Sequence, residues 1–154
     1  MIERKARPVD QPGDHLPDHL PRWLEAVSRR LAADLFAQIR TSGRFTDVRG
    51  GDRRILQMVP QGTIRITDLA ALAGMTKQAL GEFVGRLEKA GLVRSRKDPA
   101  DGRVRLVSRT PQGDAVAAAT ADAIAAVETQ WRAELGPEAY DAMLTAMRRL
   151  AAPT

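Results

Sequence analysis

Two short helical segments joined by a tight turn limit the possible folds of this chain more than any other feature. The first is predicted to begin at Thr67, whose side chain can cap it, and to end at the turn over residues 73–75. The second begins at another capping residue, Thr76, and ends at Gly91. Apolar residues recur on one face of the second segment, at Ala79, Leu80, Phe83, Val84 and Leu87. Such a pair is typical of a helix-turn-helix.

Three positions fit the crossing of these two helices. Ala70 is small where the second helix is expected to pass directly over the first. Gly74 can take the left-handed conformation of the turn, and Leu80 can anchor the second helix from below.

A basic hairpin is predicted directly after the helix pair. Two β-capable runs, residues 93–97 and 103–108, flank the turn-rich segment 98–102. In the second run Arg103 and Arg105 are expected to alternate outward, while the inward positions are Val104 and Leu106. The predicted fold is mainly α with a small β hairpin, a winged helix-turn-helix. A generic helical hairpin packed on a small sheet is the alternative.

The positive charge of the chain is concentrated in the same region. The net charge is +5, and residues 65–110 hold ten bases and five acids, whereas the rest of the chain is balanced. A local excess of this kind is the footprint of a polyanion partner, most often nucleic acid. A solvated arginine-rich face is the alternative. With a winged helix-turn-helix in the same region, the expected partner is double-stranded DNA. Binding of single-stranded RNA is not expected, because it needs exposed aromatic rings and those here mostly fall on predicted inward stripes.

Long apolar stripes lie on both sides of the basic region. Spacings of three and four residues predict a helix from Leu20 to Gly43, and Thr110 and Gly136, each followed by proline, predict the starts of two more. A shorter helix is expected at residues 52–59. One recognition helix reads too few base pairs for specificity, so a homodimer is expected. The predicted organisation is a mobile tail at 1–16 and a single unit at 17–154, with dimerisation helices at 17–43 and 110–154 and a DNA-binding winged helix at 50–109.

The outward residues of the second helix are candidates for contact with bases. Lys77 and Gln78 lie in its first turn, where lysine can donate to guanine and glutamine can pair with adenine. Gly81 and Gly85 each cost a helix about 1 kcal/mol relative to alanine. Close approach to DNA would explain that cost, and so would close contact with another protein helix. The predicted DNA-binding residues are Thr76, Lys77, Gln78, Gly81, Arg86, Arg94, Arg96, Lys97, Asp101, Arg103 and Arg105.

These candidates have different expected roles. Lys77, Gln78 and Gly81 are expected to face bases, and Arg103 at the hairpin tip is expected to enter the narrow minor groove. An ion pair of Arg103 with Asp98 or Asp101 is the alternative. The remaining bases and Thr76 are expected to position the phosphate backbone.

The stretch from Ile66 to Gly113 resembles the MarR-type transcriptional regulators, and the chain from Leu20 onward resembles them more loosely. The resemblance is carried by Asp68-Leu69-Ala70, by Gly74 to Leu80, by Leu87 to Val93, by Asp98 to Arg103, and by Thr110 and Gly113. It implies a homodimeric repressor built on the terminal helices, which binds a palindromic operator and is released by a small aromatic or phenolic effector. It also implies that Asp101 orients the wing and Arg103 inserts into DNA.

The sequence departs from the family pattern at two positions in the hairpin. An arginine that can brace the wing aspartate is usual two residues after Val93, but Ser95 stands there, and Arg94 or Arg96 is the candidate replacement. An apolar residue is usual before Thr110, where this chain has Arg109. The packing of the second wing strand is therefore open.

Other classes of function find little support in the sequence. There is no cysteine for thiolate chemistry or disulfides. His15 and His19 are spaced for a metal site, but Pro17 interrupts the helical register, so no metal is expected. Residues 50–54 lack the lysine and hydroxyl of a phosphate-binding loop, and no nucleophile has a base nearby. The prediction is a protein without catalytic residues or cofactor, not an enzyme.

The remaining alternative is a winged-helix module that binds another protein and never touches DNA. No apolar run is long enough to span a membrane, and the first residues lack the apolar core of a secretory signal. We therefore expect no membrane partner and a cytoplasmic location.

Overall fold

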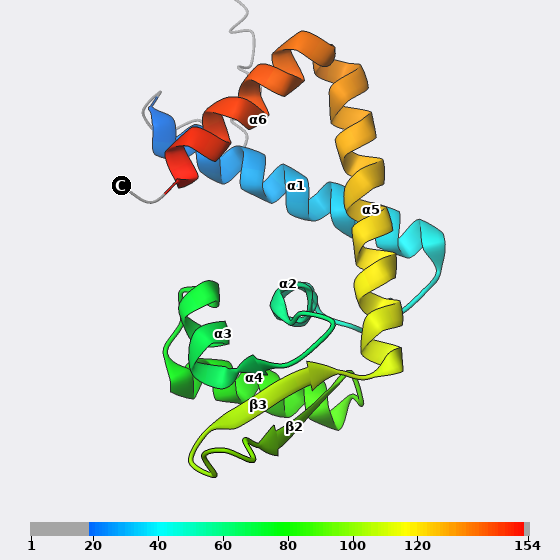
Figure 1. Cartoon of the computed structure of the whole chain (residues 1–154). Helices are drawn as coiled ribbons and strands as arrows, with labels where there is room; N and C mark the ends of the chain where they lie inside the picture. The colour runs from blue at the N-terminus through cyan, green and yellow to red at the C-terminus, as the bar shows by residue number, and fades with distance from the viewer. Residues whose placement is uncertain (1–18, 153–154) are drawn as a thin grey trace, which may run out of the picture.

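Six helices and three short strands make up the part of the chain that the computed structural model describes, residues 19–152 (Figure 1). They are α1 (Leu20–Ser42), α2 (Gly50–Met58), β1 (Ile64–Arg65), α3 (Ile66–Ala73), α4 (Lys77–Lys89), β2 (Val93–Lys97), β3 (Arg105–Arg109), α5 (Pro111–Leu135) and α6 (Pro137–Ala151). The predicted tail at residues 1–16, with His15, lies outside the described residues. The expected fold class, mainly α with a small β element, is confirmed.

The elements form two parts that α5 connects (Figure 1). One part holds α2, α3, α4 and the sheet, and is called here the winged-helix part. The other, called the helical frame, consists of α1, α5 and α6. In Figure 1 α5 rises from the end of β3, crosses α1 and leads into α6, which turns back toward the start of α1. Helix α2 contacts α3, α4 and α5, so it lies at the junction of the two parts.

Most predicted helix ends agree with the structure. Gly43 ends α1 and Gly74 ends α3, both with the positive φ that glycine adopts without strain. The Thr76 hydroxyl accepts the Ala79 amide hydrogen (3.2 Å) at the start of α4. Thr110 caps α5 in the same way by accepting from the Gly113 amide (3.0 Å). Local capping chemistry therefore sets these four boundaries.

The predicted cap at Thr67 is wrong. Helix α3 already begins at Ile66, and its N-cap is Arg65, which has extended backbone and makes no side-chain cap bond. Ile64 and Arg65 form β1 and pair with Val107 and Leu106 of β3. Pairing with a strand more than forty residues away therefore places the start of this helix.

The second wing strand begins at Arg105, two residues later than predicted, and ends at Arg109. Asp98 donates its amide hydrogen to the Val104 carbonyl (2.8 Å), and Val104 donates to the Asp101 carbonyl (2.9 Å). These bonds hold Arg103 and Val104 in the turn instead of the strand.

The predicted alternation along this strand is also wrong. Val107 is fully buried, and it lies opposite Ile64 of β1 and Ser95 of β2. Because alternate residues share a face of a strand, Arg105 lies on the side of Val107, toward the core, and Leu106 on the other side. The central position of β3 in the sheet sets this orientation.

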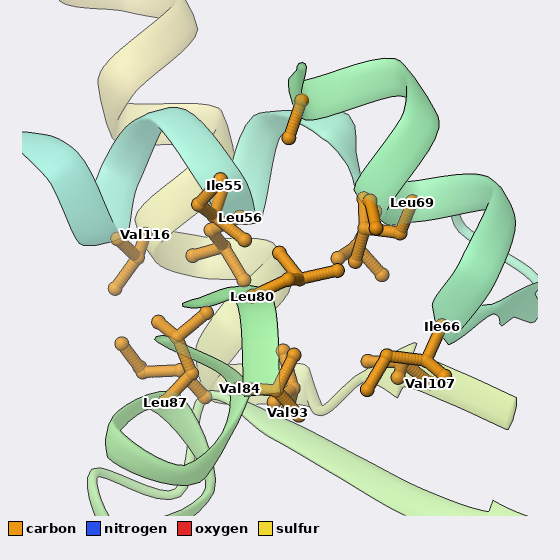
Figure 2. Packing of buried hydrophobic residues seen from close by; sticks show 14 residues of the cluster. Ile55, Leu56, Ile66, Leu69, Leu80, Val84, Leu87, Val93, Val107 and Val116 are labelled. Atoms are coloured by element: carbon orange, nitrogen blue, oxygen red, sulfur yellow. The ribbon is translucent and has the colours of Figure 1, made fainter. Parts of the chain in front are cut away.

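The core of the winged-helix part is formed by apolar side chains from nearly every element around α4 (Figure 2). Leu80, Val84 and Leu87 on the inner face of α4 are buried, as the sequence predicts, and Ala79 and Phe83 are half-buried. The cluster also contains Ile55, Leu56, Val59, Ile66, Leu69, Ala70, Ala73, Leu92, Val93, Val107 and Val116. Val116 belongs to α5, so the core ties the frame to the base of the wing.

The first turn of α5 lies directly against the chain between α4 and β2. A side-chain carbon added at Gly113 would lie 1.9 Å from the Leu92 carbonyl oxygen, so only glycine fits there. The Thr110 hydroxyl also donates to the Gly91 carbonyl (2.6 Å). The start of α5, which follows the hairpin, is therefore fixed against the residues that precede the hairpin.

Candidate nucleic-acid interface

The first turn of α4 presents polar side chains away from the core. Lys77 and Gln78 are exposed, and Thr76 precedes them as the cap. Leu80 and Val84 beneath them are completely buried, which holds the helix against the rest of the winged-helix part. The exposed residues are thus mounted on a well-packed helix, which is the arrangement that a base-reading element requires.

Gly81 and Gly85 lie on the outer face of α4. A side-chain carbon added at either position would find no atom of the described chain within 4 Å. The explanation that another helix of the chain packs there is therefore wrong for residues 19–152. Close approach to DNA therefore stays a prediction for the two costly glycines.

The turn at the wing tip is organised by two aspartates. Asp101 Oδ1 accepts the Arg103 amide hydrogen (3.0 Å), and Asp98 Oδ1 accepts the Ala100 amide hydrogen (2.9 Å). Neither carboxylate forms an ion pair with the Arg103 guanidinium among the described residues. The exposed guanidinium is therefore open to a partner, while Asp101 shapes the backbone that carries it.

The first wing strand carries three exposed bases. Arg94 and Arg96 share one face of β2, and Lys97 follows at its end. Arg94 Nε donates to the Ser108 hydroxyl across the hairpin (3.2 Å). No contact of Arg94 or Arg96 with Asp101 is present in the described part of the chain, so the expected replacement for the family arginine is not found there.

Two further predicted DNA contacts are held by acids of the chain itself. Arg86 on α4 pairs with Asp52 of α2 (3.0 Å), and its guanidinium lies over the Phe83 ring at 4.3 Å. Arg105 on β3 pairs with Glu88 of α4 (2.6 Å). The structure therefore leaves Lys77, Gln78, Arg94, Arg96, Lys97 and Arg103 exposed and Gly81 partly exposed. Arg86 and Arg105 are also partly exposed, at 41% and 40% of their side chains, but each is paired with an acid of the chain.

Glu88 belongs to the candidate site although the sequence does not predict a role for it. Partial burial disfavours its charged form, but hydrogen bonds from Ser95 and the charge of Arg105 outweigh burial and lower the pKa of Glu88 below its usual value. Its presence in a segment with twice as many bases as acids is the one signal that could have pointed to it.

The unusual Arg109 packs at the base of the wing. Its side chain is mostly buried, and its Nε lies 2.8 Å from Asp114 Oδ1 in the first turn of α5. The N–H does not point at the oxygen, so the contact is an ion pair without an aligned hydrogen bond. At the end of β3 an ion pair between Arg109 and Asp114 therefore takes the place of the apolar residue that is usual in the family pattern.

A cavity of about 750 Å³ lies between α1, α2 and α5, next to the winged-helix part. Arg49, Arg53, Arg54 and Asp47 contribute charges to its wall, and Leu31, Leu35, Phe36, Ile39, Val48, Met58 and Ile124 contribute apolar surface. Arg53 is 4% exposed, and burial lowers its pKa. Its guanidinium donates to the carbonyls of Phe45 and Val48 and to the Thr120 hydroxyl, which fixes it in the wall.

The apolar stripe of α1 is largely uncovered. Leu20, Trp23 and Leu24 are between 52% and 66% exposed, and only Ile39 near the end of the helix is buried. Leu150 on α6 is 85% exposed. The stripes predicted for dimerisation are thus present on the frame as open apolar surface.

No helix within residues 19–152 is long and apolar enough to cross a membrane. The same residues contain no cluster of histidine and acidic side chains with the geometry of a metal site.

Comparison with known protein families finds a match within the winged-helix part. Residues 59–104 match the model of the MarR family. The chain is similar to the transcriptional regulator HosA of Escherichia coli O111:H-, with 33% identity over 82 residues, which cover 53% of this chain and 61% of that protein. The match therefore spans less than two thirds of the length of this relative.

Solved structures extend the likeness to both parts of the fold. A probable transcriptional regulator from Pseudomonas aeruginosa is 26% identical, with a TM-score of 0.72 over 86% of this chain and 97% of that one. A mutant MarR from E. coli complexed with operator DNA has a TM-score of 0.74 at 17% identity, over 94% of this chain and 100% of that one. HosA and the Pseudomonas protein are both named as transcriptional regulators, which is the class that the sequence predicts. Residues 59–104 are therefore similar to the MarR family, and the described chain shares the fold of solved transcriptional regulators.

Proposed function

We propose that this protein is a transcriptional regulator that binds a specific sequence of double-stranded DNA. The observation that carries the proposal is the surface formed by the first turn of α4 and the open wing tip. Lys77 and Gln78 are exposed beside two glycines without neighbours, and Arg103 is presented by an organised turn with its guanidinium unpaired among residues 19–152. A helix of this kind fits the major groove, and an arginine at the tip fits the minor groove.

Each predicted contact has a place in this proposal. Lys77, Gln78 and Gly81 face bases, Arg103 enters the minor groove, and Asp101 orients it. Thr76, Arg94, Arg96 and Lys97 position the phosphate backbone. Arg86 and Arg105 act mainly through Asp52 and Glu88 of the chain itself.

The active form in this proposal is a homodimer. The uncovered stripes on α1 and α6 supply an apolar surface that a second copy would bury, as the assignment of residues 17–43 and 110–154 to dimerisation requires. Two copies related by a two-fold axis would read the two halves of a palindromic operator. The winged helix at residues 50–109 would be the DNA-binding region of each copy.

The proposal includes repression that a small aromatic or phenolic effector relieves. The cavity between α1, α2 and α5 has the size of a small-molecule site, with an apolar wall and a few charged groups. It lies beside α2, which contacts the recognition helix α4. Because the protein must reach chromosomal DNA, the proposal also includes a cytoplasmic location without a membrane partner.

Selection of binding sites from random duplexes with the purified protein tests the proposal. The expected result is enrichment of a two-fold symmetric sequence whose affinity falls steeply with salt, with a log–log slope of about 0.9 for each phosphate contact. A reporter gene behind the selected site should be repressed.

The second candidate is a winged-helix module that binds another protein. It predicts no enrichment of any sequence, and no duplex binding even in dilute buffer. That outcome would overturn the proposed function.

A further inference from the structure

One carboxylate at the end of α4 holds both strands of the wing. Glu88 Oε1 accepts the amide hydrogen of Ser95 on β2 (3.0 Å) and also the Ser95 hydroxyl hydrogen. Glu88 Oε2 accepts from the guanidinium of Arg105 on β3 (2.6 Å). Arg105 Nε donates to the Ser95 hydroxyl oxygen (2.7 Å), which closes the network. We call these three residues the wing bracket.

The wing bracket lies where it can set the angle between the helix and the wing. Glu88 is in the last turn of α4, and Ser95 and Arg105 lie on the face of the sheet that carries the buried Val107. Ser95 lies two residues beyond Val93 on β2, and Arg105 lies two residues before Val107 on β3. Both are therefore nearer than these valines to the tip that presents Arg103. A change in the bracket would therefore shift the tip relative to α4.

A carboxylate in this place has an electrostatic cost if the surface binds DNA. Glu88 sits among the ten bases of residues 65–110, and its charge repels phosphates. Charge-assisted hydrogen bonds to three partner groups can offset that cost by fixing geometry. The guanidinium of Arg105 takes part in this network, and its planar fork donates to Ser95 and Glu88 at the same time. A lysine ammonium on a flexible stem does not provide this geometry.

We infer that the wing bracket positions the wing tip relative to the recognition helix, so that Glu88 and Arg105 are positioning residues for sequence-specific binding. The inference rests on the proposed function. The charge of Glu88 by itself disfavours binding to DNA. In this inference the same residue helps the protein to discriminate between specific and non-specific duplexes.

The test compares affinity for the selected duplex with affinity for a scrambled duplex at one salt concentration. The variants are Glu88→Gln, which keeps the shape of the side chain, Ser95→Ala and Arg105→Lys. The control is Glu82→Gln, which removes the same charge from an exposed position on the same helix. Glu88→Gln should bind the scrambled duplex more tightly, yet the ratio of specific to non-specific affinity should fall about tenfold.

The other variants separate positioning from charge. Glu82→Gln should raise both affinities in parallel and leave their ratio unchanged. Arg105→Lys should lower the ratio while the slope of affinity with salt stays the same, because the positive charge is kept. The inference is overturned if Glu88→Gln behaves like Glu82→Gln, or if Arg105→Lys keeps the full ratio.

A second measurement needs no DNA. The chain has no cysteine, so spin labels at Glu82→Cys and Ala100→Cys report the helix-to-tip distance without background labelling. Glu88→Gln and Ser95→Ala should broaden the distribution of this distance, with circular dichroism checking that each variant is folded. An unchanged distribution in folded variants overturns the inference. The two proposals can fail separately. If the unaltered protein binds no duplex but the distance distribution still broadens in the Glu88 and Ser95 variants, the proposed function is wrong, while the role of the bracket in positioning the wing is retained.

Discussion

The winged-helix part and the helical frame bury their apolar residues to very different degrees. In the first, Leu80 and Leu87 of α4 are 0% and 1% exposed, and one continuous cluster surrounds them. In the second, Leu24 of α1 is 54% exposed and Leu150 of α6 is 85% exposed. The winged-helix part completes its own core within one chain, whereas the frame leaves a stripe that monomeric proteins rarely expose.

The difference shows that one sequence pattern can have two structural meanings. Both α1 and α4 carry apolar residues at spacings of three and four. On α4 the stripe faces α2, α3 and the sheet, and on α1 most of it faces solvent in the single chain. Periodicity predicts which face is apolar, but not whether the same chain or a second copy covers it.

The largest expected effect tests whether the winged-helix part is self-sufficient. Leu80→Ala should lower the free energy of unfolding by about 3 kcal/mol, because it removes a fully buried side chain and leaves a cavity. Leu72→Ala, at a leucine that is mostly exposed on α3, should cost no more than about 0.5 kcal/mol. Chemical denaturation at a fixed protein concentration measures both. Equal costs would contradict the complete burial of Leu80 in a core that the single chain forms by itself.

The next effect tests whether a second copy covers the frame. Leu24→Glu combined with Leu31→Glu should turn a dimer into a monomer and weaken binding to the selected duplex about 100-fold, since the two half-sites are no longer bound together. Sedimentation analysis gives the mass and a binding titration gives the affinity. Leu72→Glu, an exposed leucine of the other part, should leave the dimer intact. A double variant that still sediments as a dimer would place the interface elsewhere.

A smaller effect separates base reading from backbone contact within the winged-helix part. Gln78→Ala should relax the preference at one base pair of each half-site, by about 1–3 kcal/mol. Lys97→Ala should weaken all sequences alike and reduce the salt slope by about one contact. Selection experiments with both variants give the preference profiles. An unchanged profile for Gln78→Ala would contradict the placement of α4 in the groove, and neither variant should alter the dimer.

The smallest effect has opposite signs for stability and binding. Gly85→Ala should raise the free energy of unfolding by up to about 1 kcal/mol, because alanine favours the helix and its side chain meets no neighbour in the described chain. Binding to the selected duplex should weaken, because the added carbon lies on the outer face of α4. Thermal unfolding and a titration measure the two effects. A stabilised variant with unchanged affinity would remove close approach to DNA as the reason for this glycine.

Much of the fold could be predicted because its boundaries depend on local chemistry. Thr76, Thr110 and the glycines at the helix ends act on backbone groups within a few residues, so their effect is visible in the sequence. Thr67 has the same chemistry and still does not cap its helix, since β1 pairs with β3 and α3 starts earlier. Long-range pairing overrode the local signal at that position.

The candidate site was predicted less completely than the fold. The exposed residues at the start of α4 follow from helix geometry alone. Arg86 and Arg105 were assigned to phosphates, but their distance from Asp52 and Glu88 along the chain hides the ion pairs that hold them. The sequence therefore shows where the bases lie along the chain, but not which of them an acid of the fold pairs with.

The sequence by itself determined the helix-turn-helix, the basic hairpin and the apolar stripes, because capping, turn formation and periodicity are properties of neighbouring residues. Only the tertiary structure decided which face of β3 meets the core, which arginines stay open, and that the acid at residue 88 joins helix and wing. Those outcomes depend on contacts between segments far apart in the chain, and such contacts exist only once the elements have packed.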